Sequence, residues 1–212
     1  MALERFDPLL VRLLAPATRR LEGVDPNTVT WCGTLVGLGA AAVLWRAPGP
    51  PAGSIWLVVS AVAIASSYLL DVLDGTLART YGRATPYGDF LDHTLDRVVD
   101  TALLLAVAHN LAWFGDSRLG LWAVVGMLFG SYMGTQARSS GLPRDLSGFS
   151  RTDRLALLAL GALVSAVPLE QPINGLAPAV VLVGVGGVYT FVYRFLRGRA
   201  ALKGRRDRGS AE

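Results

Sequence analysis

Residues 71–96 read DVLDGTLARTYGRATPYGDFLDHTLD, an acidic stretch that joins two apolar segments. Residues 54–70, before it, carry no charge, and residues 101–115, after it, carry only His109 as a candidate charge. With its flanking residues, each segment approaches the roughly 20 helical residues that cross a bilayer. Because only a short loop over residues 80–87 separates them, the two helices are expected to be antiparallel neighbours.

Six of the twelve aspartates lie within this region, from Asp71 to Asp100. Asp71 and Asp74 are three residues apart, and Asp92 and Asp96 are four apart, so each pair shares one helix face. Charge in or against a bilayer is costly, which makes such carboxylates candidates for function. The two faces are predicted to bring four carboxylates to one point.

Four carboxylates this close would repel one another unless cations neutralise them. The stretch offers oxygen donors without a cysteine or a second nearby histidine, and the single cysteine, Cys32, lies in an apolar run. Hard oxygen ligands favour Mg²⁺ or Mn²⁺ over zinc. Two such ions about 4 Å apart can clamp a diphosphate and polarise a phosphoryl group. The sequence therefore predicts two divalent ions here.

A structural explanation competes with this one, in which the aspartates cap helices or pair with Arg79, Arg83 and Arg97. Such contacts suit single aspartates but do not require two same-face pairs. His93 and His109 are the other conceivable acid–base groups and are treated as incidental.

Other classes of membrane protein make different predictions. A cation- or proton-coupled transporter would also carry intramembrane carboxylates, but with an inverted repeat and broken helices, neither of which is evident. A membrane scaffold would need no array of aspartates.

Four further uncharged, mostly apolar stretches complete the pattern in a chain of 212 residues that is 52% hydrophobic. They cover residues 29–45, 119–137, 155–169 and 172–193. The predicted fold is an all-α integral membrane protein, with six transmembrane helices in a catalytic domain of residues 25–197. A cleaved signal peptide is not expected, because acidic residues precede the first apolar run.

The basic residues are distributed asymmetrically. Of the 20 Lys and Arg residues, all but Arg46 and Arg118 fall on one side if the N-terminus is cytoplasmic. By the positive-inside rule, both termini and the acidic site are placed on the cytoplasmic side, and we expect the plasma membrane.

The two ends of the chain are amphipathic or basic. Apolar residues at helical spacing predict an interfacial amphipathic helix within residues 1–24, with packing against the bundle as the alternative. Residues 198–212 are predicted to form a basic cytoplasmic tail suited to anionic lipid heads. Nucleic acid is not expected as a partner, because no aromatic residues are interleaved with the basic ones.

The acidic stretch resembles the signature of the CDP-alcohol phosphotransferase (CDP-alcohol phosphatidyltransferase) family, D-x2-D-G-x2-A-R-x8-G-x3-D-x3-D. Residues 71–96 match all eight specified positions. The family has six membrane helices after an interfacial helix, in agreement with the hydropathy. The resemblance implies a phospholipid biosynthesis enzyme. Such an enzyme transfers a phosphatidyl-type group from a CDP-lipid to the hydroxyl of an alcohol and releases CMP.

The resemblance also implies roles for the matched residues. The metal ligands would be Asp71, Asp74, Asp92 and Asp96. Asp96 would also be the catalytic base. The nucleotide site would comprise Gly75, Ala78, Arg79 and Gly88, with Asn27 facing the same cavity. Asp89 and Asp100 are not fixed positions of the signature and receive no role. The implied partners are a CDP-linked lipid, a small polar alcohol and membrane lipids; a homodimer is left open.

A second basic cluster lies in and beside residues 139–152. Arginine forks suit phosphate, so a pocket for a phosphorylated acceptor is predicted here. Its proposed members are Arg138, Arg151 and Arg154. Topology and lipid contact are the alternative explanation for the cluster.

The region also resembles family members that make phosphoinositol lipids, through Ser131-Tyr132 and the paired arginines. Gly134 and Gln136 depart from the basic residues that those enzymes tend to carry. Inositol phosphate and glycerol 3-phosphate therefore both remain open as acceptors, and serine is disfavoured.

Overall fold

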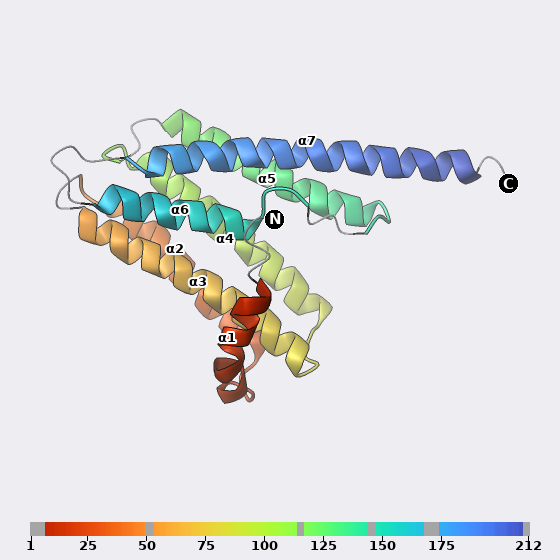
Figure 1. Ribbon diagram of the computed structural model, residues 1–212, viewed down its shortest axis with the longest axis horizontal. Coiled ribbons are helices and arrows are strands. Elements are labelled where there is room, and N and C mark those ends of the chain that lie inside the picture. The colour runs from red at the N-terminus through yellow and green to blue at the C-terminus, as the bar shows by residue number, and fades with distance from the viewer. Residues whose placement is uncertain (1–6, 50–52, 114–116, 144–146, 168–173, 210–212) are drawn as a thin grey trace.

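The computed structural model describes residues 7–49, 53–113, 117–143, 147–167 and 174–209, with side chains from residue 10 to residue 204. Within these ranges the regular structure is entirely helical (Figure 1). The helices are α1 (Asp7–Arg20), α2 (Pro26–Arg46), α3 (Ser54–Thr80), α4 (Pro86–His109), α5 (Ser117–Ser139), α6 (Arg151–Ala166) and α7 (Leu176–Gly209). The prediction of an all-α fold is confirmed for the described residues.

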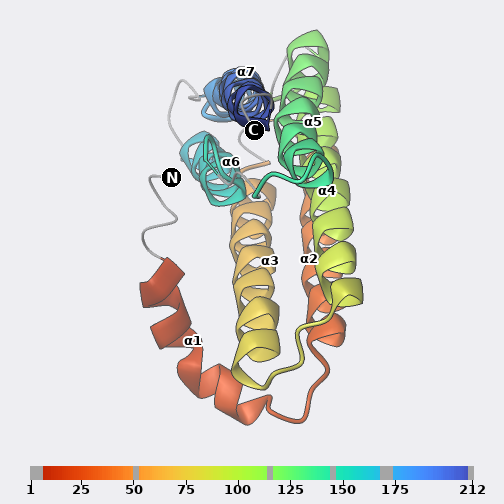
Figure 2. The same ribbon diagram turned by 90° about the vertical axis from the view of Figure 1, so that its right-hand side faces the viewer.

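The six helices after α1 form a closed ring (Figure 2). Around it, the order of packed neighbours is α2, α3, α6, α7, α5, α4 and again α2. The expectation that the two acidic helices pack on each other is therefore wrong, because α3 and α4 both pack on α2. Gly37 of α2 permits this arrangement. A Cβ at that position would come within 2.8 Å of Ser67 on α3 and 2.6 Å of Val99 on α4.

Three helices begin with side-chain caps at the end of the bundle where the acidic residues lie. Asp25 accepts a hydrogen bond from the backbone N–H of Asn27 at the start of α2 (3.1 Å), with proline at the first helical position. Thr85 caps α4 in the same way, and Ser150 forms a capping box with Asp153 at the start of α6. Such caps satisfy the free N–H groups of a first turn and fix where the helix starts.

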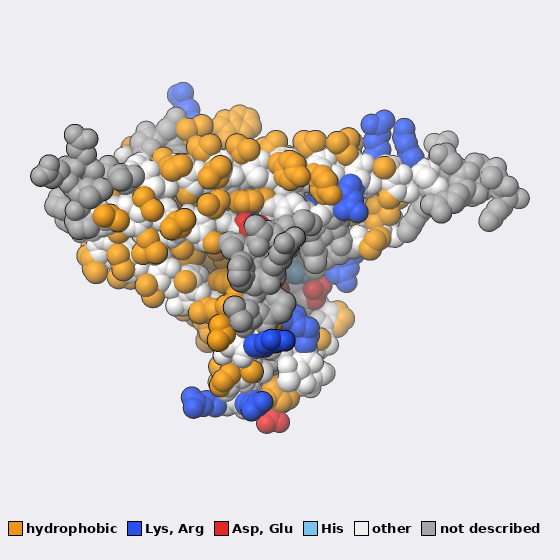
Figure 3. Space-filling model, viewed as in Figure 1, with side chains coloured by type: hydrophobic (Ala, Val, Ile, Leu, Met, Phe, Trp, Pro, Cys, Tyr) orange, Lys and Arg blue, Asp and Glu red, His pale blue; other side chains and the backbone are white. Residues whose placement is uncertain are grey.

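Apolar residues fill the other half of the bundle and much of its surface. The core includes Leu44, Leu57, Leu104 and Met127, all nearly inaccessible to solvent. Hydrophobic side chains also cover much of the face in Figure 3, where most of the Lys and Arg side chains lie towards the lower and right-hand parts. A surface this apolar suits lipid rather than water.

Among the residues that the structure describes, three helices are long and apolar enough to cross a membrane: α2, α3 and the part of α7 over residues 176–204. These apolar helices and the apolar surface indicate a membrane protein. Helix α6 has only 16 residues and is about 24 Å long. The charged first turns of α4 lower its hydropathy. Six spans therefore stay a prediction.

Helix α1 packs against the end of α3, where Leu14 and Ala17 contact the cluster of Val29, Leu73 and Leu77. Its position at a membrane interface stays a prediction. At the other end of the chain, the expected basic tail continues α7 as helix through Gly209.

Candidate active site

The acidic faces of α3 and α4 do meet, and an arginine of α6 lies between them. Arg151 Nη1 is 2.7 Å from Asp71 Oδ1 and 2.8 Å from Asp96 Oδ1. Arg151 belongs to the first turn of α6, so the capping box at Ser150 sets the position of its backbone. The two acidic pairs thus converge as predicted. They do so because α3 and α4 both pack on α2 and because Arg151 of α6 contacts an aspartate of each pair, not because α3 packs on α4.

Two carboxylate oxygens in this cluster are suited to a cation. Asp74 Oδ2 and Asp92 Oδ1 are buried and have no hydrogen-bond partner among the described residues. Buried charge without a partner costs free energy, and a bound cation would remove that cost. Ligand atoms of Asp92, His93 and Asp96 also lie within 4.8 Å of one another. His93, treated as incidental from sequence, is therefore close enough to join a metal site.

A cavity of about 170 Å³ lies beside Asp74 and Asp92. Its lining includes every residue predicted to bind the nucleotide: Asn27, Gly75, Ala78, Arg79 and Gly88. The two glycines keep this space open, since a Cβ at Gly88 would approach Asn27 Oδ1 to 3.3 Å. At Gly75 it would approach Arg79 Nη1 to 3.2 Å.

A second cavity, of about 610 Å³, opens on the other side of Asp96 between α4, α5, α6 and α7. Its charged lining residues are His93, Asp96, Arg97, Arg151, Arg154 and Arg194. Arg194 Nε donates to the backbone carbonyl of Ser147 (2.8 Å) and its Nη1 to that of Gly130 (2.9 Å). Sequence reasoning missed Arg194, because it begins a basic run that topology alone explains.

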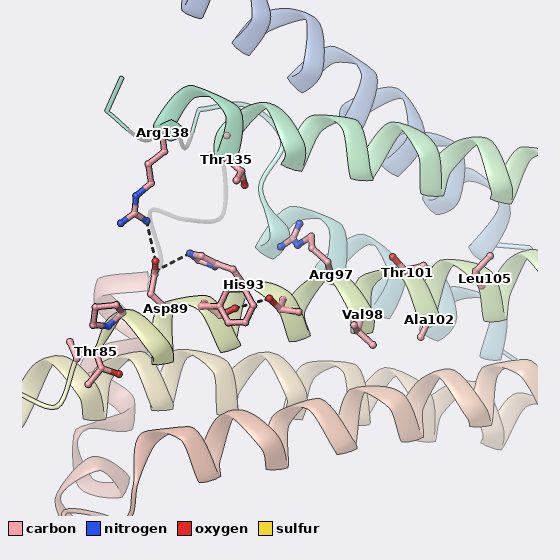
Figure 4. A pocket seen from close by; sticks show the side chains of 15 residues that line it. Thr85, Asp89, His93, Arg97, Val98, Thr101, Ala102, Leu105, Thr135 and Arg138 are labelled. Carbon is pink, nitrogen blue, oxygen red and sulfur yellow. Dashed lines mark hydrogen bonds and ion pairs between the residues drawn. The ribbon is translucent and has the colours of Figure 1, made fainter. Parts of the chain in front are cut away.

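Arg138 does not reach this cavity. Its Nη1 lies 3.0 Å from Asp89 Oδ2, and the other oxygen of Asp89 lies 3.1 Å from His93 Nε2. Figure 4 shows this cluster at one end of a groove of about 1150 Å³ along α4 and α5. Of the three arginines predicted together, the structure brings Arg151 and Arg154 to the cavity that Asp96 lines and leaves Arg138 apart.

The structure also shows the partners of Asp89 and Asp100, the two aspartates that the signature left without a role. Asp89 contacts Arg138 and His93, whereas Asp100 is buried among arginines of α4 and α6. His93 and Arg97 lie on α4 with these aspartates, but Arg138, Arg151 and Arg154 come from other helices, so spacing along α4 could not reveal them.

Comparison with known proteins agrees with this geometry. The sequence model of the CDP-alcohol phosphatidyltransferase family matches residues 24–191, which hold both cavities apart from Arg194. The chain belongs to this family. The predictions of the family and of a phosphotransferase enzyme are confirmed, and no finding favours a transporter.

Relatives of this CDP-alcohol phosphatidyltransferase include archaetidylinositol phosphate synthase of Methanothermobacter thermautotrophicus, 30% identical over 92% of each chain. Phosphatidylinositol phosphate synthase of Cutibacterium acnes is 36% identical over 82% of this chain and 80% of its own. The crystal structure of Mycobacterium tuberculosis phosphatidylinositol phosphate synthase with CDP-DAG bound superimposes with a TM-score of 0.74. It is 30% identical and covers 88% of this chain and 94% of its own. The same mycobacterial enzyme in complex with manganese and citrate gives a TM-score of 0.72, with 30% identity over 86% of this chain and 87% of its own.

Proposed function

We propose that this CDP-alcohol phosphatidyltransferase transfers a phosphatidyl-type group from a CDP-lipid to inositol phosphate, releasing CMP. The observation that carries the proposal is the arrangement of two polar cavities on either side of one acidic cluster. Asp74 and Asp92 line the smaller cavity, and Asp96 lines the larger one with four arginines. Donor and acceptor would therefore meet at the carboxylates.

On the donor side, the residues of the smaller cavity would hold the CDP group. Gly75 and Gly88 leave space for a nucleotide to approach the helix backbones, and Arg79 supplies a guanidinium at the same cavity. This assignment agrees with the mycobacterial relative, whose structure was solved with CDP-DAG bound.

On the acceptor side, an arginine-lined cavity suits a phosphorylated alcohol better than serine. Arg154 and Arg194 come from different helices and lie at one cavity with Asp96. Guanidinium groups bind phosphate through paired, charge-assisted hydrogen bonds. Relatives named as synthases of inositol phosphate lipids favour inositol phosphate over glycerol 3-phosphate.

In the reaction, the oxygen of the acceptor hydroxyl would attack the lipid-bearing phosphorus while Asp96 accepts the hydroxyl proton. The new O–P bond forms as the bond from that phosphorus to the CMP oxygen breaks, and CMP leaves with the electron pair. A base within hydrogen-bond reach makes a hydroxyl an effective nucleophile.

Asp71, Asp74, Asp92 and Asp96 would hold divalent metal, either Mg²⁺ or Mn²⁺. The unpartnered buried oxygens of Asp74 and Asp92 fit such a cation, and the mycobacterial relative has been crystallised with manganese. When bound, divalent metal would offset the charge of the diphosphate and of the leaving CMP.

Purified enzyme supplied with CDP-diacylglycerol and Mn²⁺ tests the proposal. We expect CMP release with inositol phosphate, little with glycerol 3-phosphate or free inositol, and none after EDTA until metal is restored. Transfer to serine but to neither phosphorylated alcohol would overturn the acceptor assignment. Full activity in EDTA would overturn the metal assignment.

A further inference from the structure

Asp100 lies one helical turn beyond Asp96 on α4, outside the family signature. Its side chain is 1% exposed, which makes it the most deeply buried carboxylate of the ion-pair cluster. Three guanidinium groups surround it. Asp100 Oδ2 lies 2.8 Å from Arg154 Nη2 and 3.5 Å from Arg97 Nη1, and Oδ1 accepts from Arg151 Nε at 3.4 Å.

These three arginines all line the larger cavity, whereas Asp100 does not. Guanidinium groups gathered this closely would repel one another, and their burial would add a further cost. One buried carboxylate between them offsets both effects. Asp100 therefore stabilises the three arginines that line the cavity without lining it itself.

The other contacts of Arg154 and Arg151 show what Asp100 contributes. Arg154 is otherwise held by a donation from Nη1 to the backbone carbonyl of Phe149 (3.3 Å), and its buried Nε has no hydrogen-bond partner among the described residues. Arg151 Nη1 points to Asp71 and Asp96. Without Asp100, Arg151 would keep those two carboxylates as partners, whereas Arg154 would keep only a backbone carbonyl among the described residues.

We infer that Asp100 is a positioning residue that fixes Arg154 for the phosphate of the acceptor and so sets how tightly the acceptor is held. The inference rests on the proposed function. Asp100 lines neither cavity and acts only through Arg154.

A purely structural role makes a different prediction. A buried ion pair that only stabilised the bundle would, when broken, lower the melting temperature and impair donor and acceptor alike. A positioning role raises the KM of the acceptor selectively, and its effect disappears once the arginine it positions has been removed.

The test compares three full-length variants, D100N, R154Q and the double variant, assayed with CDP-diacylglycerol, Mn²⁺ and the phosphorylated acceptor that the wild type uses. We expect D100N to raise the KM of the acceptor roughly ten- to a hundredfold, the range for one hydrogen bond to a charged group. The KM of the CDP-lipid should stay near its wild-type value. In the double variant, the KM of the acceptor should match that of R154Q alone.

Direct binding gives a second measurement. Isothermal titration of each variant with the acceptor, without CDP-lipid, should show the same loss of affinity in D100N as the kinetics do. D100N leaves buried arginine charge uncompensated, which lowers the stability of the bundle. If D100N does not fold, D100E, which keeps the charge but moves the carboxylate, takes its place in the same comparison.

Two outcomes would overturn the inference. One is an unchanged acceptor KM in folded D100N, and the other is a double variant whose acceptor KM is raised by the product of the single effects. Failure of the proposed function looks different, because the wild type itself would then transfer to neither phosphorylated alcohol.

Discussion

Asp96 links the two sides of the site. It lines the larger cavity and also a small polar cavity that borders Asp71 and Asp74. Its Oδ1 is 2.8 Å from Arg151 Nη1, and its Oδ2 is 3.6 Å from Arg97 Nη2. Asp96 therefore lies where an acceptor in the larger cavity and the other signature aspartates meet, within reach of a hydroxyl proton.

Replacing Asp96 by Asn should remove the base while keeping nearly the same shape. We expect kcat to fall by about 10²–10⁴-fold, the usual contribution of general base catalysis. Binding of CDP-lipid should persist, because the residues of the smaller cavity are untouched. Single-turnover CMP release and equilibrium binding of CDP-lipid measure the two quantities separately. Near-normal turnover would exclude Asp96 as the base.

Arg194→Gln should weaken binding of the acceptor. Its guanidinium group lines the larger cavity from α7, so we expect the acceptor KM to rise roughly tenfold or more. Arg197→Gln is the matched control, because Arg197 lies on the same helix but lines neither polar cavity and should leave the KM unchanged. An equal rise in both variants would point to the net charge of α7 instead.

At the scale of helices, the close approach of α5 and α7 forms one wall of the larger cavity. Glycines permit this approach because they have no side chain. A Cβ on Gly126 would lie 2.8 Å from the carbonyl oxygen of Gly184, and a Cβ on Gly130 would lie 2.8 Å from the carbonyl oxygen of Gly187. Small residues let membrane helices pack closely through their backbones. Arg194 can donate to Gly130 only because of this proximity.

Gly126→Ala should therefore destabilise the bundle, since the added methyl group meets backbone that cannot easily move. We expect the free energy of unfolding to fall by about 1–3 kcal/mol, as in other overpacked sites. Thermal unfolding in detergent measures this as a lower Tm. Gly39→Ala is the matched control, because a Cβ there has nothing within 4 Å and alanine favours a helix. Equal Tm values for the two variants would contradict the packing argument.

At the scale of the whole molecule, the ring of six helices places the caps of α2, α4 and α6 and the acidic cluster at one end. Arg46 and Arg118 lie at the far ends of α2 and α5. The basic continuation of α7 lies beyond the site end (Figure 1). By the positive-inside rule, this arrangement supports the prediction that both termini and the site lie on the cytoplasmic side.

Labelling of single cysteines tests both this orientation and the number of spans. In a Cys32→Ser background, cysteine replacing Arg118 should react with a membrane-impermeant maleimide in intact cells. Cysteine replacing Lys203 should react only after the membrane is opened. Three crossings, by α5, α6 and α7, place the two positions on opposite sides of the bilayer. Labelling of both from outside would show that the three helices do not all span.

Local sequence determined which segments are helices and which residues are candidates for the chemistry. The apolar runs, the caps at Asp25 and Thr85, and the spacing of the four signature aspartates are all properties of neighbouring residues. Helix geometry follows from such neighbours, and the shared face of each acidic pair follows from helix geometry. The convergence of the two pairs was predicted on this basis, whereas the residues around the nucleotide cavity were implied by the resemblance to the family signature.

Only the tertiary structure decided which helix faces meet. Periodicity defines the apolar face of a helix but not its partner, so sequence could not place α2 between α3 and α4. For the same reason it could not bring Arg194 to the larger cavity, leave Arg138 at Asp89, or surround Asp100 with three arginines. Apart from Arg97, which lies three residues from Asp100 on α4, the residues in these contacts are tens of positions apart. The contacts form because buried charges must find partners in whatever helices the packing brings near.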